Sequence, residues 1–270
     1  MWRFDHQHYQ QLAQQHHEAH QKADPFPHSV IDNFLPPEVC DGLLGEFPSP
    51  RGKEWQQIDK RDHKKLAAQK ISQLGEFTRN VMHELNGPSM LAFLEALTGI
   101  TGLIPDPYLE GGGLHQIERD GFLKIHADFN IHPQLKLDRR LNLILYLNKD
   151  WKDEYNGHLE LWDREVKNCV QKILPVCNRA VVFNTTDFAW HGHPERLLCP
   201  PGWTRKSVAL YFYSNGRPAE ERSESHGVLW KERPTTVTPQ LPLRSRVLLR
   251  MAELMEKPVK WMRRKASPRR

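Results

Sequence analysis

The pair His126-Ala-Asp128, followed more than sixty residues later by His191, is the feature that most limits how this chain can fold. The surrounding segment 121–130 is rich in apolar and β-branched residues, which predicts a strand. Alternate residues of a strand point to the same side, so His126 and Asp128 can reach one metal ion together. Two imidazoles and one carboxylate suit a non-haem Fe(II) ion and leave coordination positions open. We therefore predict that the fold brings these three residues together around iron.

A second group of motifs surrounds His191. The apolar run Arg179–Phe183 precedes it and predicts a buried strand, and the run Arg205–Tyr213 predicts another. Arginine offers two parallel donors to the two oxygens of a carboxylate, so Arg205 and Ser207 on one face would form a carboxylate clamp. An iron site beside such a clamp fits a dicarboxylate cosubstrate. Strand alternation places Arg205, Ser207, Ala209 and Tyr211 on one face, and Lys206, Val208, Leu210 and Phe212 on the other.

The segment from about residue 26 to residue 217 resembles the Fe(II)/2-oxoglutarate dioxygenases, in particular their prolyl 4-hydroxylase-like branch. One departure from the family pattern is the pair Asn156-Gly157, which stands where a Gly-Gly pair is common. The motifs that carry the resemblance are His126-x-Asp128, Leu145-Tyr-Leu-Asn-Lys-Asp-Trp151, Asn156-Gly-His-Leu-Glu-Leu-Trp162, Phe183-Asn-Thr-Thr, His191-Gly192 and Arg205-x-Ser207.

The resemblance implies a set of residue roles and a reaction. His126, Asp128 and His191 would hold Fe(II), and Arg205 would bind the distal carboxylate of 2-oxoglutarate with help from Ser207 and Tyr146. Dioxygen would be the oxidant, with ascorbate as a reductant that maintains ferrous iron. The reaction would hydroxylate an unactivated C–H bond of a peptidyl proline, a small molecule or a glycan, with release of succinate and CO2.

Short strands that follow a helical half predict an α+β fold. We expect a double-stranded β-helix, of the jelly-roll or cupin-like kind, backed by N-terminal helices. The predicted organisation is a polar lead-in at 1–24, a helical support region at 25–104, the dioxygenase core at 105–232, and a basic C-terminal tail at 233–270.

Three helices are expected in the support region. Two prolines at 36–37 suit the first turn of one helix, since proline tolerates that position. A second helix is expected around Gln69–Leu85, and a third at Pro88–Leu97, ended by Gly99.

The length and composition of the chain are typical of a soluble globular protein. Its 270 residues can bury one full core, and 39% hydrophobic and 26% charged residues are typical of a soluble protein. The first residues do not have the pattern of a secretory signal, and no apolar run approaches the ~20 residues of a membrane span. The four cysteines form no Cys-x-x-Cys pair, which favours a reducing, cytoplasmic location suited to ferrous iron.

The positive charge is concentrated in the tail. Residues 243–270 hold ten basic and two acidic residues, a net +8, so the rest of this +5 chain carries −3. This distribution argues against a nucleic-acid-binding body. Apolar residues at helical spacing predict an amphipathic helix, which either docks on the domain or, with Trp261 and Met262, contacts the inner membrane surface. Contact of the tail with nucleic acid is a third alternative, and the oligomeric state stays open.

Several residues have alternative interpretations. His193 competes with His191 as the third ligand, because it faces the same way if the strand continues. We prefer His191, which directly precedes a glycine as in the related family, whereas the segment 192–194 has the composition of a turn. Arg205 could instead form a surface salt bridge, and Tyr146 could be a core aromatic residue. The remaining histidines near the site, His115, His132 and His158, could be hydrogen-bonded core or surface residues.

Two further functional classes are compatible with the same residues. A jelly-roll metalloprotein of the isomerase kind would use the same ligands without 2-oxoglutarate, and Arg205 with Ser207 argues against it. A catalytically inactive binding protein could keep the fold, although the intact set of ligands and the clamp argue against that too.

Overall fold

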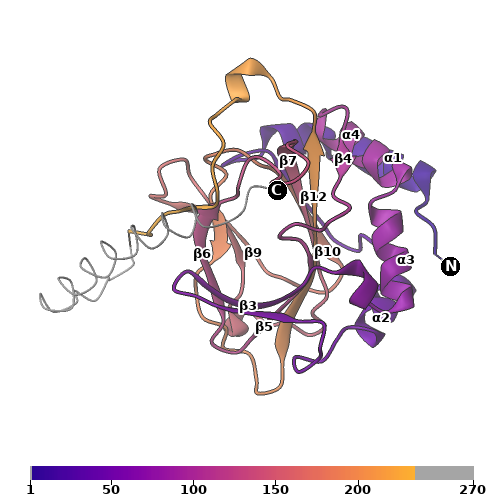
Figure 1. Cartoon of the computed structure of the whole chain (residues 1–270), viewed down its shortest axis with the longest axis vertical. Helices are drawn as coiled ribbons and strands as arrows, with labels where there is room; N and C mark the ends of the chain where they lie inside the picture. Colours follow the sequence, from indigo (N-terminus) through magenta and orange to yellow (C-terminus); the bar gives the residue numbers. More distant parts are fainter. Residues whose placement is uncertain (1, 235–270) are drawn as a thin grey trace, which may run out of the picture. The chain divides into compact units, whose positions relative to one another are not determined.

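Antiparallel strands in two facing layers form the centre of the chain that the computed structural model describes, residues 2–234 (Figure 1). The strands are β1 (His28–Ile31), β2 (Gln56–Asp59), β3 (His63–Ala68), β4 (Ile104–Pro105), β5 (Gly113–Glu118), β6 (Phe122–Ala127), β7 (Asp138–Tyr146), β8 (Leu159–Trp162), β9 (Cys169–Ile173), β10 (Arg179–Asn184), β11 (His191–His193), β12 (Thr204–Ser214) and β13 (Leu229–Trp230). The first layer has the order β1-β10-β7-β12-β5, and the second has the order β6-β11-β8-β9. The predicted double-stranded β-helix is confirmed.

Strand β3 joins the two layers. Its residues 66–68 pair with β5 in the first layer, and its residues 63–64 pair with β6 in the second. The hairpin partner β2 lies on its outer side, while β4 pairs with β12 and β13 pairs with β6. Because β3 spans the gap between the layers, its side chains reach the space that the layers enclose.

The long strand β12 shows the predicted alternation. Val208, Leu210 and Phe212 are buried in the main hydrophobic cluster, which also contains residues of the helices. The alternate residues Arg205, Ser207, Ala209 and Tyr211 line a cavity between the layers. A strand with one face against helices and one against a polar cavity therefore explains the mixture of apolar and polar residues in this segment.

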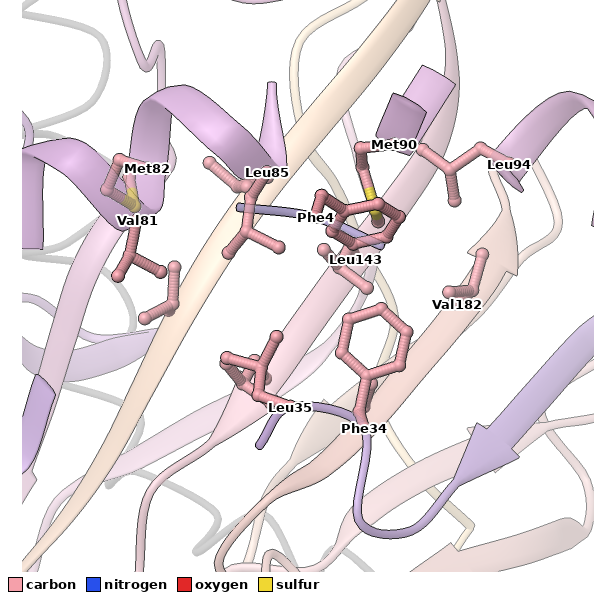
Figure 2. Packing of buried hydrophobic residues seen from close by; sticks show 14 of the residues in the cluster. Phe4, Phe34, Leu35, Val81, Met82, Leu85, Met90, Leu94, Leu143 and Val182 are labelled. Atoms are coloured by element: carbon pink, nitrogen blue, oxygen red, sulfur yellow. The ribbon is translucent and has the colours of Figure 1, made fainter. Parts of the chain in front are cut away.

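Helices cover the outer face of the first layer (Figure 1). In Figure 2, Met82 and Leu85 of one helix and Met90 of the next lie above Leu143 of β7 and Val182 of β10. All five side chains are almost completely buried, so their contact fixes the helices on the sheet. The helices are α1 (His6–Lys22), α2 (Pro37–Gly45), α3 (Glu76–Leu85) and α4 (Pro88–Thr98), and the short 3-10 helices are Ile71–Gln73, Asp153–Tyr155 and Ala219–Glu221.

Two of the predicted helices have the expected form. The helix α2 begins at the second proline of the pair 36–37, and α4 begins at Pro88. Gly99 follows α4 in the left-handed conformation, with φ of 71°, and its amide donates to the carbonyl of Glu95. Glycine adopts this conformation without the strain that a Cβ atom causes, so it ends the helix there.

The helix predicted around Gln69–Leu85 is wrong in its first half. The structure has a 3-10 turn at Ile71–Gln73, an extended Gly75, and α3 only from Glu76. The carboxylate of Glu46 accepts hydrogen bonds from the backbone amides of Phe77 and Thr78, at 3.1 and 2.8 Å. This cap comes from a residue about thirty positions earlier, so local sequence patterns do not reveal where the helix begins.

The region 25–104 also contains strands that the sequence analysis did not predict. They are β1, β2 and β3, and in β2 three of the four residues are exposed. The alternating apolar pattern by which a strand is recognised is absent from such an exposed segment. These strands form because their backbones pair with β10 and with β5 and β6, which are distant in the sequence.

The polar lead-in forms a helix that is part of the compact unit 1–233. Asp5 caps α1 by accepting from the amide of His8, and Tyr9, Ala13 and His20 are buried on one side of it. The hydroxyl of Tyr9 donates to the carbonyl of Phe34 at 2.6 Å. None of the helices in the described part of the chain is long and apolar enough to cross a membrane.

The predicted basic tail, 233–270, lies outside the described residues except for its first two. The amphipathic helix and the membrane contact of Trp261 and Met262 therefore stay predictions.

Candidate metal centre

A cavity of about 170 Å³ lies between the two layers. Its walls come from residues on β3, β5, β6, β7, β8, β11, β12 and β13. The loop after β6 contributes Asp128 and Phe129. All six residues that the sequence analysis assigned to the metal and the cosubstrate line this cavity: His126, Asp128, His191, Arg205, Ser207 and Tyr146.

His126 and His191 face each other across a strand pair. They are directly opposite in the register of β6 and β11, and their ring centroids are 4.4 Å apart. Asp128, two residues beyond His126, lies between them: its Oδ1 is 3.6 Å from Nε2 of His126, and its Oδ2 is 3.6 Å from Nε2 of His191. One donor atom from each residue lies within 4.8 Å of the others, which is the spacing of ligands around a single ion.

Backbone carbonyls orient both imidazoles. Nδ1 of His126 lies 2.9 Å from the carbonyl of Lys124, and Nδ1 of His191 lies 2.9 Å from that of Ala189. Nδ1 therefore carries the proton and donates, which leaves the lone pair of Nε2 directed at the site. Burial lowers the pKa of His126 to about 3 and also lowers that of His191, so both rings are neutral and able to bind a metal.

Asp128 is held as a carboxylate by Arg139 and Asn142, neither of which the sequence analysis identified. Nη2 of Arg139 lies 3.0 Å from Oδ2 of Asp128, and Nδ2 of Asn142 donates to the same oxygen at 2.7 Å. Burial alone would raise the pKa of Asp128, but the charge of Arg139 and the hydrogen bond from Asn142 outweigh it and hold the pKa well below its usual range.

A bulge in β7 turns Arg139 towards the cavity. In the pairing of β7 with β12, Leu141 lies opposite Phe212, but Arg139, rather than Arg140, lies opposite Tyr213. The extra residue places Arg139 on the same side as Asn142, whereas regular alternation would place it on the opposite side. The sequence contains no local signal for this bulge.

These residues fit a bound Fe(II) ion. Two neutral nitrogen donors and one carboxylate converge from one side, and their orienting partners are already in place. Such a set suits a non-haem ferrous ion with open positions.

Arg205 lies at the other end of the same cavity and has no carboxylate partner among residues 2–234. Its Nε donates to the carbonyl of Gly157 at 2.8 Å, and its Nη2 donates to the hydroxyl of Tyr146 at 3.2 Å. The side chain is 5% exposed, so the surface salt bridge considered as an alternative does not occur in the described chain. A buried guanidinium without a counter-ion is expensive, and a bound carboxylate would compensate it.

His193 and Ser207 add further polar groups to the cavity that Arg205 lines. His193 is buried, and neither of its ring nitrogens has a hydrogen-bond partner within the described residues. Ser207 lies opposite Tyr146 in the register of β12 and β7, so both hydroxyl side chains belong to the same wall. A buried guanidinium without a carboxylate partner, next to an unsatisfied imidazole and a hydroxyl group, fits the distal part of 2-oxoglutarate.

A register shift separates His193 from the metal ligands. Between His191 and His193 the pairing with β6 moves, so that His193 lies opposite Leu123. The ring of His193 lines the cavity but does not belong to the ligand cluster that contains His191. The geometry therefore favours His191 as the third ligand.

Of the other three histidines considered near the site, one lines the cavity and two do not. His115 lines the cavity, with Nε2 3.1 Å from the carbonyl of Gly111. His132 is buried elsewhere, where Nε2 contacts Asp106 at 3.2 Å and Nδ1 accepts two backbone amides. His158 contacts Asp153 at 3.0 Å outside the cavity. Trp151, Trp162 and Trp190 are buried.

Several cavity residues lie outside the motifs found in the sequence, among them Lys65 and Trp230. Lys65 comes from β3 and Trp230 from β13, two strands that the sequence analysis did not identify. Trp230 lies opposite His126 in the strand register and is 37% exposed, so it forms a wall near the opening.

The part of the chain that carries these residues is similar to a known protein family. Residues 112–213 match the model of the 2OG-Fe(II) oxygenase superfamily. Prolyl 3-hydroxylase OGFOD1 from Mus musculus is 27% identical, and the similar region covers 70% of this chain but 33% of the mouse protein. The chain thus matches about a third of the length of that relative.

Solved structures show the same fold. A prolyl hydroxylase from Trichoplax adhaerens, solved with a hypoxia-inducible-factor peptide, has a TM-score of 0.57 at 15% identity, with 77% of this chain and 91% of that chain covered. A prolyl 4-hydroxylase from Phytophthora capsici has a TM-score of 0.54 at 16% identity, with coverage of 79% and 67%. The match to the family model spans β5 to β12, the strands that carry the proposed ligands and the clamp, so this part of the chain is similar to the 2OG-Fe(II) oxygenase superfamily.

Proposed function

We propose that this protein is an Fe(II)- and 2-oxoglutarate-dependent dioxygenase that hydroxylates a C–H bond of its substrate. The observation that carries the proposal is one cavity with three converging metal donors at one end and a buried, unpaired Arg205 at the other. A dicarboxylate that binds iron through one end and a guanidinium through the other matches this arrangement.

Each protein group has a defined task in this proposal. His126, Asp128 and His191 hold the ion, and Arg205 with Tyr146 fixes the distal carboxylate of 2-oxoglutarate. Bound Fe(II) supplies the redox chemistry with dioxygen, by which one oxygen atom enters succinate and the other enters the substrate as hydroxyl, with release of CO2. The buried walls keep water away from the reacting groups, which strengthens every charge interaction in the cavity.

The substrate class is either a peptide that contains proline or a small molecule or glycan. The mouse relative is named a prolyl 3-hydroxylase, and the Trichoplax structure holds a peptide, which supports a peptidyl proline. The cavity opens beside the exposed ring of Trp230, an apolar surface on which a proline ring or the apolar face of a sugar could pack.

The test is an untargeted substrate screen with two readouts. Protein reconstituted with Fe(II), 2-oxoglutarate and ascorbate is incubated in air with pools of proline peptides, small metabolites and glycans. We expect succinate above the level of the protein alone, together with a substrate that has gained one oxygen atom. An isomerase-like metalloprotein would instead bind the ion and neither consume dioxygen nor form succinate.

An inactive binding protein would fail at an earlier step. Titration of the metal-free protein with Fe(II) under anaerobic conditions should show one ion per chain, and 2-oxoglutarate should then bind to the complex. Absence of stoichiometric iron binding would contradict the proposal and support the binding-protein alternative.

A further inference from the structure

Lys65 is a cation in the wall of the cavity that the proposed reaction leaves without a role. It lies on β3 and lines the cavity together with His63, two residues earlier on the same face of the strand. No carboxylate within residues 2–234 lies within salt-bridge distance of its ammonium nitrogen, in contrast to Lys124, which contacts Asp62 and Glu232. Burial lowers the pKa of Lys65 to about 8, so the ammonium is still its main form at neutral pH.

The other two cations of the cavity are already engaged. Arg139 pairs with Asp128, donates to Asn142, and stacks on the ring of Tyr211 at 3.6 Å. Arg205 is held by Gly157 and Tyr146 and is assigned to the distal carboxylate of 2-oxoglutarate. Lys65 is thus the cation that remains available in the described cavity.

The charges of the cavity do not balance once the cosubstrate and metal are counted. Three cationic side chains, Lys65, Arg139 and Arg205, face one carboxylate, Asp128. Burial lowers the pKa of all the lining histidines, so these rings are neutral: His63, His115, His126, His191 and His193. Fe(II) and the 2-oxoglutarate dianion carry opposite charges of equal size, so they leave the positive excess unchanged. A further anion in the cavity would reduce the cost of this excess.

Lys65 lies two residues from His63 on the cavity-facing side of β3. The ring of His63 stacks on the partly exposed Trp230, with 5.6 Å between centroids. The cavity-facing side of β3 therefore runs from the rim at His63 to Lys65 within the cavity.

We propose that Lys65 binds an oxyanion group of the substrate, a carboxylate or a phosphate, while the rest of the substrate packs against Trp230. This inference rests on the proposed function, since it presumes that 2-oxoglutarate occupies Arg205. It implies that the enzyme selects acidic substrates over neutral analogues of the same shape, with the selecting residue on a strand outside the family match at 112–213.

Matched pairs of small probes test the inference without turnover. The protein is loaded with Zn(II), which has no redox chemistry, and with saturating 2-oxoglutarate to occupy Arg205. Ligand-observed NMR then compares carboxylic acids with their primary amides, and phosphate monoesters with their parent alcohols. We expect the anionic members of at least one series to bind about tenfold or more tightly than their neutral partners, as a buried ion pair requires.

Variants of two neighbouring lysines identify the responsible group. Lys65→Met should reduce the anion preference to within about twofold, and Lys65→Arg should keep most of it. Lys64→Met is the matched control, because it removes the same charge from the next residue on β3, which does not line the cavity. The preference should survive in that control.

Three results would overturn the inference. The wild type could show no preference for anions, or the preference could persist in Lys65→Met. A third contrary result is that Lys65→Met weakens 2-oxoglutarate and leaves the probes unaffected, which would assign Lys65 to the cosubstrate. If the wild type binds neither Zn(II) nor 2-oxoglutarate, the proposed function fails, and the same probe titration on the metal-free protein still decides the role of Lys65.

Discussion

Asp128 is oriented by Arg139 before any metal binds. Oδ2 of Asp128 lies 3.0 Å from Nη2 of Arg139 and also accepts from Asn142, so Oδ1 is the oxygen that remains for a metal ion. Arg139 is in turn fixed between the rings of Tyr211 and Phe129, at 3.6 and 4.5 Å. The carboxylate therefore serves two purposes, as a proposed ligand and as the counter-ion of a buried guanidinium.

Removal of Asp128 should consequently destabilise the protein even without iron. Asp128→Ala leaves Arg139 buried and unpaired, which costs about 3–5 kcal/mol in the free energy of unfolding. Urea denaturation of the metal-free wild type and variant measures the loss. The double variant Asp128→Ala/Arg139→Met should recover much of this stability yet still fail to bind Fe(II). Full iron binding or turnover in Asp128→Ala would contradict the assignment of the ligand.

Arg205 should control the binding of 2-oxoglutarate and not that of iron. Loss of a carboxylate contact in a partly dry site costs on the order of 2–5 kcal/mol, so Arg205→Met should raise the apparent KM for 2-oxoglutarate by tens-fold or more. Anaerobic titration with Fe(II) should be unchanged. The control is Lys206→Met, whose side chain lies on the opposite face of β12 and outside the cavity. A larger effect from Lys206→Met than from Arg205→Met would contradict the clamp.

Gly192 should be needed to keep His191 opposite His126. A Cβ atom at Gly192 would lie 2.7 Å from the carbonyl oxygen of Lys124 and 2.8 Å from that of Leu123. Neither backbone atom can move without parting β6 and β11, so Gly192→Ala should weaken Fe(II) binding by about tenfold or more. Gly45→Ala is the control, since nothing lies within 4 Å of its added Cβ. Unchanged iron affinity in Gly192→Ala would show that the strands accommodate the methyl group.

His20 should make the stability of the fold depend on pH. It is buried between Ser29 and Asn184, and burial lowers its pKa from 6.5 to about 4. Below pH 6.5 the unfolded chain binds a proton at His20 that the folded chain does not. The free energy of unfolding that depends on a neutral His20 is therefore fully present above pH 6.5 and is lost as the pH falls towards 4. At pH 4 the free energy of unfolding is lower by about 3 kcal/mol for this reason.

Urea unfolding of the metal-free protein between pH 7.5 and 4.5 measures this dependence. The variant His20→Gln should show a shallower decline, whereas His6→Gln, an exposed position on the same helix, should follow the wild type. If the free energy of unfolding fell equally steeply with pH in all three proteins, His20 would not be the cause of the pH dependence.

The residues of the proposed site were predictable because strand geometry is local. Alternation in β12 placed Arg205 and Ser207 on one face, and the i, i+2 spacing placed His126 beside Asp128. The choice of His191 over His193 came from a resemblance, and only the register shift in β11 gives it a geometric reason.

The sequence by itself determined the double-stranded β-helix and the candidates for the metal ligands and the clamp, since these depend on residue chemistry and on patterns only a few residues long. The tertiary structure decided the rest. The strand β3 forms by pairing with β5 and β6, the bulge in β7 turns Arg139 towards Asp128, and the cap of α3 comes from Glu46. Each of these depends on a partner that is distant in the sequence, and for that reason Lys65 could be recognised only once the two layers were assembled.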